Sequence, residues 1–405
     1  MAQNNNAVSI VTVKNKIPLY KGDEQANSIE VIELEEVGFE LVANKTLYQV
    51  GDKAIYIQPD YCVSDIPLFE SFIRPNGDES KSMLGKVEGL PRRIRAKKFT
   101  LSKEPNGDPV YSNGILLPLL EVENYCKNNK KGWHNSVHWI NNSLYKELEI
   151  TKYEEPDPVS KGGLRSGQTE GKFPEGLYKT DEENINNLWN HIEKKIGYPV
   201  TLAGTEKVDG SSITIGITPK IPEGFICSRN LRKKLTIKKV TGRRTKKWYE
   251  KLMFWTNPDL NLYTEVENDG DFVKYGKPYL DLLINSGETN LIFRGELNGG
   301  KLKGSGNKNN PASKEPVNIK VFGLDKINEY GEAEKIPYLL FKTECEKAGV
   351  PLVKEVFNKE FNSKEELLTE CNNYFKENMI EGIVVRTLDS KFSAKIMNLH
   401  YDSMK

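Results

Sequence analysis

The sequence has no hydrophobic run that approaches the roughly 18 residues a membrane-spanning helix needs. Residues 1–6 lack the basic and apolar pattern of a signal peptide. The five cysteines are odd in number, scattered and without a Cys-x-x-Cys pair, so neither a disulfide framework nor a zinc site is indicated. The four histidines form no metal-ligand cluster. We therefore expect a soluble protein of a reducing compartment, the cytoplasm.

Net charge is also nearly absent. The chain has 58 Lys and Arg against 57 Asp and Glu, so its total charge of +1 indicates no class of partner. Its 405 residues predict about two or three domains. The useful signal lies in how charged and apolar residues are distributed along the chain.

The region from residue 8 to about residue 120 contains short apolar stretches separated by turns. Many short strands at regular spacing are typical of an all-β barrel or sandwich, and at this size we expect a five-stranded OB-fold barrel. A basic cluster here suits a phosphate backbone and a stacked base, although a charged strand edge that resists aggregation explains it equally well. The cluster consists of Arg92, Arg93, Arg95, Lys97 and Lys98, followed by Phe99. The predicted strands are Val8–Val13, Ile29–Leu34, Phe39–Val42, Lys53–Ile57, Arg93–Arg95 and Gly114–Pro118.

The pattern weakens after this region. A helix is predicted around residues 134–148, and residues 154–163 are rich in Pro, Gly and charge, a composition typical of an interdomain linker. We therefore divide the chain into an OB-fold domain with a helical extension (1–155), a linker (156–175) and a second domain (176–405). In the second domain, Thr180 and Glu183 form a capping-box pair. The apolar helical face that follows, ending at Gly197, consists of Ile185, Leu188, Ile192 and Ile196.

The stretch Glu206-Lys207-Val208-Asp209-Gly210-Ser211-Ser212 precedes an alternating run of isoleucines, which predicts a half-buried strand. If the chain is extended at Lys207, then Lys207 and Asp209 lie on one face. A lysine nucleophile must be a neutral amine, whereas Asp209 alone would stabilise the ammonium. A reactive Lys207 therefore predicts a metal ion between the two groups. The alternative is an ordinary surface Lys-Asp pair beside a turn.

A basic run follows, with nine cations between residues 232 and 247 and no acidic residue before Glu250. Trp248, Tyr249, Phe254 and Trp255 come directly after it. Clustered cations with adjoining aromatics fit a track for single-stranded nucleic acid, and a merely solvated charge run is the alternative. The cations are Arg232, Lys233, Lys234, Lys238, Lys239, Arg243, Arg244, Lys246 and Lys247.

Further predicted strands carry single polar groups near their ends. Residues 291–297 include Glu296, residues 317–321 precede Phe322, residues 381–386 begin with Glu381, and Lys395 opens the last one. Ser363 and Glu366 cap a helix that runs to about residue 375. Taken singly, each carboxylate is explained as a strand-end group in solvent.

Taken in order, these motifs resemble those of the covalent nucleotidyltransferases, a superfamily that comprises ATP-dependent ligases and capping guanylyltransferases. The ordered set is Lys-x-Asp-Gly at 207–210, Ser-Arg-Asn at 228–230, Gly-Glu at 295–296, the aromatic strand at 317–322, Glu-Gly-Ile-Val-Val at 381–385 and Lys395. The N-terminal half narrows the match, because segments 50–57, 93–98, 114–118, 150–154 and 179–182 look like those of RNA ligases whose OB domain precedes the transferase. The chain thus resembles an ATP-dependent RNA ligase of the RNA ligase 5 type.

The resemblance implies an α+β fold, with an N-terminal OB-fold β-barrel followed by a nucleotidyltransferase domain built on antiparallel sheets with flanking helices. It also implies three steps, in which Lys207 takes AMP from ATP, the AMP passes to an RNA 5′-phosphate, and a 3′-hydroxyl displaces it. The implied catalytic residues are Lys207, Asp209, Glu296, Glu381 and Lys395. Asp209, Glu296 and Glu381 would hold Mg²⁺ or Mn²⁺ through water. The nucleotide would be bound by Glu206, Lys207, Val208, Gly210, Arg229, Asn230, Glu296, Phe322, Glu381 and Lys395, with Phe322 stacked on adenine.

Some positions depart from the family pattern. Met397 stands where a second lysine is usual, with Lys391 at the wrong spacing to replace it. Asn184 and Asn186 replace a usual arginine and glutamine. We expect RNA with nicked or broken ends as the partner, no membrane, a monomer, and an end-healing kinase or phosphatase as accessory. The alternatives are a DNA ligase or capping guanylyltransferase, against which the domain order argues, and a non-catalytic nucleic-acid-binding protein.

Overall fold

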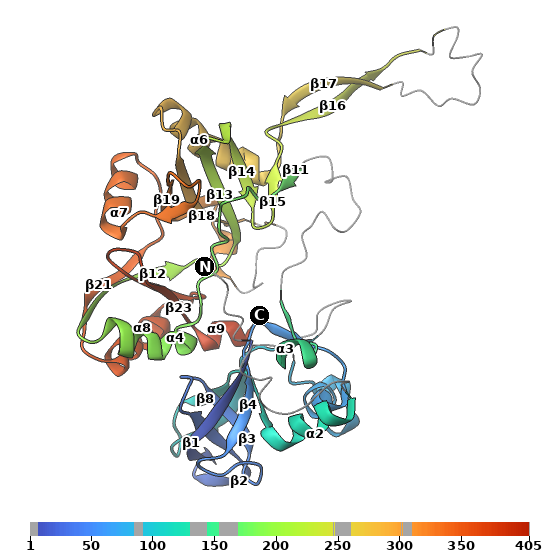
Figure 1. Cartoon of the computed structure of the whole chain (residues 1–405), viewed down its shortest axis with the longest axis vertical. Helices are drawn as coiled ribbons and strands as arrows, with labels where there is room; N and C mark the ends of the chain where they lie inside the picture. Colours follow the sequence, from blue (N-terminus) through green and yellow to red (C-terminus); the bar gives the residue numbers. More distant parts are fainter. Residues whose placement is uncertain are drawn as a thin grey trace.

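The computed structural model describes residues 7–84, 92–129, 144–153, 169–245, 247, 261–300, 302 and 310–404. The buried apolar side chains form two groups, one within residues 7–150 and one within residues 173–396. In Figure 1 the elements that carry the first group form the lower body, and the elements that carry the second form the two stacked sheets above it. No helix of the described residues is long and apolar enough to cross a membrane.

The N-terminal body is built on antiparallel strands, as its short alternating apolar stretches predict. The order in its main sheet is β3-β2-β1-β4-β9, with β7 paired to β1 and β8. Among the described strands no pairing closes this sheet into a barrel, so the OB-fold assignment stays a prediction. The strands are β1 (Val8–Lys21), β2 (Glu24–Leu34), β3 (Glu40–Asn44), β4 (Lys53–Ile57), β7 (Lys97–Ser102), β8 (Pro109–Ser112) and β9 (Ile115–Pro118).

A second, three-stranded sheet and several short helices complete this body. Its order is β10-β5-β6, from Thr151–Lys152, Tyr61–Val63 and Arg92–Arg93. The helix predicted around residues 134–148 falls largely outside the described residues, apart from α3. The helices are η1 (Pro67–Phe69), α1 (Glu70–Ile73), η2 (Pro75–Gly77), η3 (Glu79–Lys81), α2 (Leu119–Asn129) and α3 (Leu144–Glu147).

The upper sheet of the second body has seven antiparallel strands in the order β11-β15-β14-β13-β18-β19-β20. The isoleucines of β13 lie on one face, where they pack against α6 (Asp271–Asn285), and α7 (Tyr338–Lys347) adds to the same core. β11 lies inside the stretch that we predicted as linker, so this sheet takes in residues before 176. The strands are β11 (Thr169–Lys172), β13 (Ser211–Thr218), β14 (Ile221–Ser228), β15 (Leu231–Lys233), β18 (Leu291–Asn298), β19 (Asn318–Ile327) and β20 (Ala333–Lys335).

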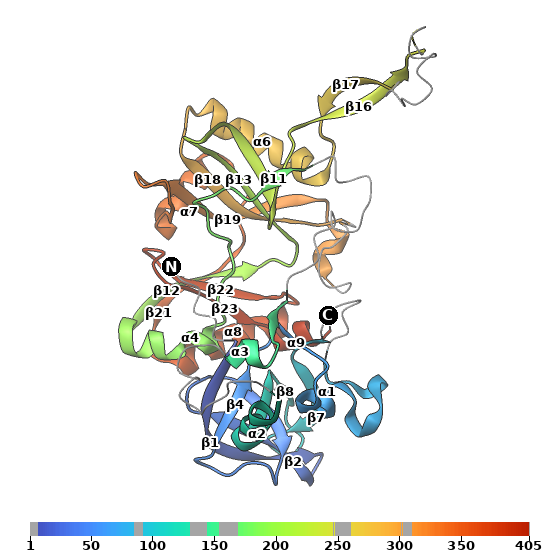
Figure 2. The same ribbon diagram turned by 45° about the vertical axis from the view of Figure 1, so that its right-hand side comes forward.

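The lower sheet has the order β21-β12-β22-β23. Its outer face is covered by α4 (Ile185–His191), the π-helix η7 (Ile192–Ile196) and α8 (Lys364–Glu377), which bury Leu202, Ile383 and Val385. Figure 2 shows this sheet between the upper sheet and the N-terminal body. The strands are β12 (Val200–Lys207), β21 (Glu355–Phe361), β22 (Gly382–Thr387) and β23 (Ser393–Met397), and α9 (Leu399–Ser403) follows.

Strand alternation directs polar side chains between the two sheets. On β12, Leu202 belongs to the core under α4 and α8, whereas Ala203 belongs to the core of the upper sheet. The odd-numbered residues of β12, which include Lys207, therefore face the upper sheet. On β18, Phe293 packs in the core beside α6, so Arg294 and Glu296 lie on the opposite face. The polar faces of β12 and β18 thus meet between the sheets.

The capping box predicted at Thr180 and Glu183 is wrong. The helix begins at Ile185, and its N-cap is Asn184, whose side chain accepts from the Asn186 N–H at 3.0 Å. The residues before the helix are extended instead. Glu183 O accepts from Lys395 N at 2.8 Å, and Asn184 forms an isolated parallel β-bridge with Lys395. The prediction for α8 is confirmed, since Ser363 Oγ accepts from Glu366 N at 3.2 Å.

Candidate active site

Lys207 is the last residue of β12, and its side chain forms an ion pair with Glu381. The register explains the contact, because Lys207 lies opposite Gly382, the first residue of β22. The carboxylate of Glu381 is only 8% exposed, whereas the Lys207 side chain is 28% exposed. A buried acid thus holds an amine that still reaches the space between the sheets.

Asp209 lies in the turn between β12 and β13, not on a strand as an extended chain at Lys207 would place it. Its carboxylate accepts from the Tyr401 hydroxyl at 2.8 Å, and its backbone carbonyl accepts from Asn310 Nδ2 at 2.8 Å. Helix α9 and the residue before η8 (Pro311–Lys314) therefore fix Asp209 from two sides. Burial and Asp209 together raise the pKa of the Tyr401 phenol, so this hydroxyl stays a donor.

Gly210 brings the turn against the strand that carries Glu296. A Cβ at this position would lie 2.5 Å from Leu297 O and 3.0 Å from Glu296 Cγ. Because real Cβ atoms do not approach backbone that closely, only glycine permits this contact without a shift. The glycine therefore draws the loop that follows Lys207 onto the end of β18, beside Glu296.

The carboxylates decide the charge on Lys207. Burial by itself lowers the pKa of the Lys207 amine, but the charges of Glu381, Glu296 and Asp209 outweigh it and hold that pKa above the ordinary value. The three acids and the lysine thus act on one another, although they lie up to 174 positions apart. With these groups alone the amine is an ammonium and no nucleophile.

Lys395 lies on β23 opposite Val384 of β22, and β22 separates β23 from β12. Its ammonium lies 3.6 Å from Asp60 Oδ2, a carboxylate of the N-terminal body. The structure therefore places Lys395 on the same sheet as Lys207, with its charge directed to the interface between the two bodies.

Arg229 comes from the end of β14 and contacts the same interface. Its Nη2 lies 2.6 Å from Asp181 Oδ2, and Lys152 Nζ lies 3.3 Å from that oxygen. Burial raises the pKa of the Asp181 carboxyl, but Arg229, Lys152 and Lys395 overcome it, and the pKa falls below its usual value. Asn230 accepts through its carbonyl from Phe173 N at 3.1 Å. The charges of Arg229 and Lys395 therefore both act on the Asp181 carboxylate.

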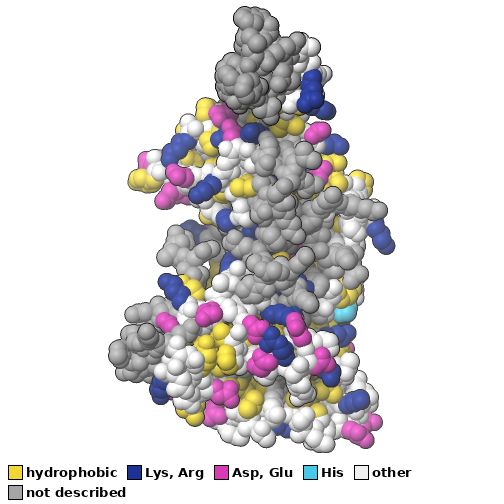
Figure 3. All heavy atoms as spheres, turned by 90° about the vertical axis from the view of Figure 1, so that its right-hand side faces the viewer, with side chains coloured by type: hydrophobic (Ala, Val, Ile, Leu, Met, Phe, Trp, Pro, Cys, Tyr) yellow, Lys and Arg dark blue, Asp and Glu magenta, His cyan; other side chains and the backbone are white. Residues whose placement is uncertain are grey.

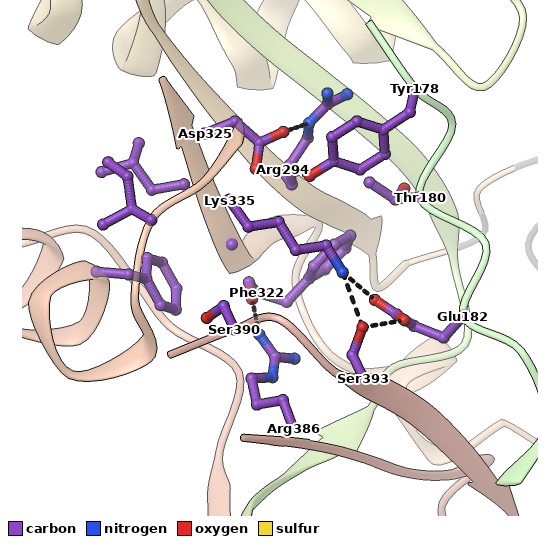
Figure 4. Close-up of a pocket in the computed structure, with 14 residues that line it drawn as sticks. Tyr178, Thr180, Glu182, Arg294, Phe322, Asp325, Lys335, Arg386, Ser390 and Ser393 are labelled. Carbon is purple, nitrogen blue, oxygen red and sulfur yellow. Dashed lines mark hydrogen bonds and ion pairs between the residues drawn. The ribbon is translucent and has the colours of Figure 1, made fainter. Parts of the chain in front are cut away.

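Phe322 lines a pocket between the sheets (Figure 4). It is the extra residue of a β-bulge, because Arg294 pairs with Gly323 while Gly295 pairs with Val321. Bulges re-aim side chains beside functional sites. The polar wall of the pocket includes Tyr178, Glu182, Asp325, Lys335, Arg386 and Ser393.

Two arginines, which we did not predict, dominate this pocket. Arg294 is 1% exposed, and its Nε donates to Asp325 Oδ2 at 2.7 Å. Arg386 donates to the Phe322 carbonyl at 2.6 Å. Within the described part, Arg294 Nη2 and Arg386 Nε are buried without a hydrogen-bond partner, so each guanidinium keeps an unused donor. A charged residue inside the apolar stretch 291–297 was the signal for Arg294, since buried arginine requires a partner.

Glu206 lies on the other face of β12 from Lys207. Its carboxylate accepts from the Tyr374 hydroxyl at 2.6 Å and lies 3.5 Å from Lys354 Nζ. The side chain of Glu206 therefore points towards α8, away from the site. Trp248, Tyr249, Phe254 and Trp255 lie outside the described residues, as does Lys246.

Comparison with known proteins agrees with this geometry. No curated protein sequence matches the chain. Among solved structures, Naegleria gruberi RNA ligase with pyrophosphate is similar, with 18% identity, a TM-score of 0.66 and 98% of each chain covered. A lysine-to-alanine mutant of that ligase with ATP and Mn gives 19% identity, a TM-score of 0.65 and again 98% of each chain. At these identities the likeness shows the shared fold.

The sequence itself matches a family as well. Residues 200–397 match the family model for RNA ligases. This segment begins with β12 and ends with β23, so it contains Lys207, Glu296, Phe322, Glu381 and Lys395. This segment of the chain is therefore an RNA ligase domain.

Proposed function

We propose that the chain is an ATP-dependent RNA ligase that seals 5′-phosphate and 3′-hydroxyl RNA ends through a lysyl-AMP intermediate, in RNA repair. The observation that carries the proposal is the convergence of Asp209, Glu296 and Glu381 on the Lys207 amine. The similar Naegleria ligase was solved with ATP and with AMP, each together with Mn, which supports the choice of nucleotide and metal. The N-terminal body serves as the OB-type domain of such a ligase.

The first step is the attack of neutral Lys207 on the α-phosphate of ATP. A phosphorus–nitrogen bond forms, the bond from the α-phosphorus to the bridging oxygen breaks, and pyrophosphate leaves with that electron pair. The amine proton passes to solvent or to a nearby carboxylate. Lys395 and Arg229 exchange their carboxylate partners for phosphate oxygens, and so stabilise the charge that develops there.

Two further steps complete the reaction. An RNA 5′-phosphate oxygen attacks the AMP phosphorus, the bond to Lys207 breaks, and the amine is regenerated. The 3′-hydroxyl then attacks the RNA 5′-phosphorus, and AMP leaves as the phosphodiester forms. A kinase or phosphatase partner supplies the required ends when breakage leaves others.

The three carboxylates fit a hard divalent cation, because Mg²⁺ and Mn²⁺ prefer oxygen ligands. In the described part no three such side chains are close enough to hold an ion directly, which favours contact through water molecules. Bound there, the cation neutralises the carboxylates that keep Lys207 protonated, and so lowers the pKa of its amine.

The base of the nucleotide fits the pocket in front of Phe322. Its ring stacks on Phe322, whose position in the bulge directs the side chain into the pocket. The guanidinium groups of Arg294 and Arg386 line this pocket and provide positive charge towards the nucleotide. Lys335, which contacts Glu182 and Ser393, borders the same pocket (Figure 4).

Labelling with ATP that carries a radioactive α-phosphate tests the proposal. With Mg²⁺ or Mn²⁺ the wild-type protein gains an acid-labile label, and Lys207→Ala abolishes it. Lys354→Ala is the matched control, because it removes an exposed lysine from the opposite face of the neighbouring segment. Nicked RNA compared with nicked DNA, and ATP compared with GTP, separate an RNA ligase from a DNA ligase or a capping enzyme. An unlabelled wild type would refute the proposal.

A further inference from the structure

The basic run predicted from the sequence forms a free-standing ribbon. β16 (Thr236–Arg243) pairs with β17 (Asn261–Glu267), and the two make a sheet of their own. Figures 1 and 2 both show this ribbon projecting away from the upper sheet. Every residue of the two strands is half-buried or exposed. An isolated two-stranded hairpin is marginally stable in water, so such an arm needs either a firm base or a partner.

The base of the arm is firm. Asn268 is 2% exposed, its Nδ2 donates to Lys234 O at 2.7 Å, and its backbone N–H donates to Leu235 O at 2.9 Å. Its Oδ1 accepts from Gly270 N at 3.0 Å, directly before α6. The first cations of the basic run are also held, since Arg232 pairs with Glu170 and Glu223, and Lys233 lies over the Phe272 ring. The arm therefore leaves the transferase domain from a fixed point.

Further along, the cations are not neutralised in the same way. Lys238, Lys239 and Arg243 are exposed and form no ion pair with a described residue. Glu265 lies opposite Lys238 in the register, but it accepts a hydrogen bond from Thr236 at 2.6 Å. Figure 3 shows Lys and Arg side chains at the upper end of the molecule, on the side from which the arm projects. Exposed cations in this arrangement fit a polyanion.

One face of the arm also carries an aromatic side chain. Val240 and Tyr263 lie opposite each other, 52% and 47% exposed. By strand alternation and the bulge after Val240, they share a face with Lys238 on one side and Arg243 on the other. An exposed aromatic ring between two cations can stack on an unpaired base while the cations contact phosphates. A paired base in a duplex does not offer its face in this way.

We propose that the β16–β17 arm binds the single-stranded RNA that leads to the break, through base stacking on Tyr263 and phosphate contacts from Lys238 and Arg243 on the same face, with Lys239 contacting the RNA from the other face of the ribbon. This inference rests on the proposed function, because it assumes that RNA is the substrate. The arm contributes to the capture of RNA that extends beyond the ends being joined. It does not touch Lys207, so it takes no part in the transfer of AMP to the enzyme.

The test uses the full-length triple variant Lys238→Gln/Lys239→Gln/Arg243→Gln. We expect its affinity for a long single-stranded RNA to fall about tenfold, and the dependence of log affinity on log salt to become shallower by about 2, because three phosphate contacts are lost. Self-adenylylation with labelled ATP stays at the wild-type rate. The matched control is Lys194→Gln/Lys195→Gln/Lys376→Gln. It removes the same charge from exposed lysines of η7 and α8. We expect this control to leave the salt dependence unchanged.

A second pair of variants tests the aromatic contact. Tyr263→Ala weakens binding of the single strand, whereas Tyr263→Phe retains it, since stacking needs the ring and not the hydroxyl. If the triple variant and the wild type showed equal salt dependence, the proposal would be overturned. It would also be overturned if the triple variant lost affinity for duplex RNA but bound single-stranded RNA as the wild type does. If the wild type took no label from ATP, the proposed function itself would fail, and the two failures are thereby distinguished.

Discussion

The ammonium of Lys395 lies 3.6 Å from the carboxylate of Asp60, so a lysine of the last transferase motif is paired with the N-terminal body. Asp60 also accepts from Arg93 Nη2 at 2.5 Å, and Arg93 lies over the Tyr153 ring. A phosphate that binds Lys395 must compete with Asp60 for the same ammonium. In the proposed mechanism, the position of the N-terminal body and the binding of nucleotide are therefore coupled through this pair.

The first prediction concerns that competition. Asp60→Asn removes the charge that holds Lys395, so the ATP concentration for half-maximal self-adenylylation should fall by up to about fivefold, equivalent to about 1 kcal/mol for a partly exposed ion pair. The measurement is the ATP dependence of labelling at saturating metal. Asp65→Asn, which removes an exposed partner of Arg74, should leave that value unchanged. A higher ATP requirement in Asp60→Asn would show that the carboxylate positions the lysine instead.

The second prediction concerns the metal site. Glu296→Ala and Glu381→Ala should each lose self-adenylylation by at least about 100-fold, because Lys207 loses the groups that hold the cation close to the α-phosphate. The fold should survive, as circular dichroism would verify, since neither side chain belongs to the apolar cores of the sheets. Glu355→Ala, which pairs with Lys342 and Tyr338 away from Lys207, serves as the control. Normal labelling in both variants would remove the metal site from the mechanism.

The third prediction concerns the protonation of Lys207. Without metal its pKa is held above the ordinary value, so the neutral fraction of the amine should rise about tenfold per pH unit from about pH 6 to about pH 8. The ammonium stabilises the fold below the ordinary pKa, and this contribution is lost only as pH rises through the still higher folded pKa. The contribution of Lys207 to the free energy of unfolding should therefore stay constant from about pH 6 to about pH 8, while the reactivity of its amine rises.

Glu381→Gln tests the cause of that shift. Removal of the nearest negative charge lowers the pKa of Lys207, so an amine-acylating reagent should modify this lysine faster in the variant, as mass spectrometry of the peptide would measure. The reagent needs neither ATP nor metal, which separates the pKa from catalysis. Glu355→Gln should not change the modification of Lys207. Equal rates in Glu381→Gln and wild type would show that Glu381 does not control the charge.

The fourth prediction concerns the hydroxyl that holds Asp209. Tyr401→Phe removes a hydrogen bond that this buried carboxylate accepts, which costs about 1–3 kcal/mol of folding free energy. The metal concentration needed for labelling should rise, because the orientation of Asp209 is no longer fixed. Tyr374→Phe is the matched control, since it removes a comparable bond to Glu206 on the other face of the sheet. Its stability should fall while its metal requirement stays at the wild-type value.

The fifth prediction concerns the buried pair of Arg294 and Asp325 in the pocket beside Phe322. Arg294→Met leaves Asp325 buried with only the Tyr178 hydroxyl, which donates at 2.8 Å, and should destabilise the protein by about 3–5 kcal/mol. The double variant Arg294→Met/Asp325→Asn should recover much of this loss, because no unpaired charge remains. Midpoints of urea unfolding measure both effects. Equal destabilisation in the single and double variants would contradict this account of the pair.

Several features could be read from the sequence because they depend on neighbours along the chain. Alternation and glycine at 207–217 predicted the turn and strand after the lysine, and Ser363 with Glu366 predicted the start of α8. The order of short motifs predicted an RNA ligase, and residues 200–397 match the family model for RNA ligases. Local patterns fail where a distant partner competes. After Thr180, the Lys395 N–H donates to Glu183 O, so this segment is extended and forms no helical turn.

The sequence by itself determined the reactive residue types, their order and the family, because these rest on side-chain chemistry and strand periodicity. Only the tertiary structure decided which groups meet. It paired Lys207 with Glu381 across two strands, held Asp209 with Tyr401, assembled the pocket around Arg294 and Arg386, and directed Lys395 to Asp60. The reason is that strand register and sheet packing set the distances between charges, and those distances decide whether an amine is held as a cation or can be released as a nucleophile.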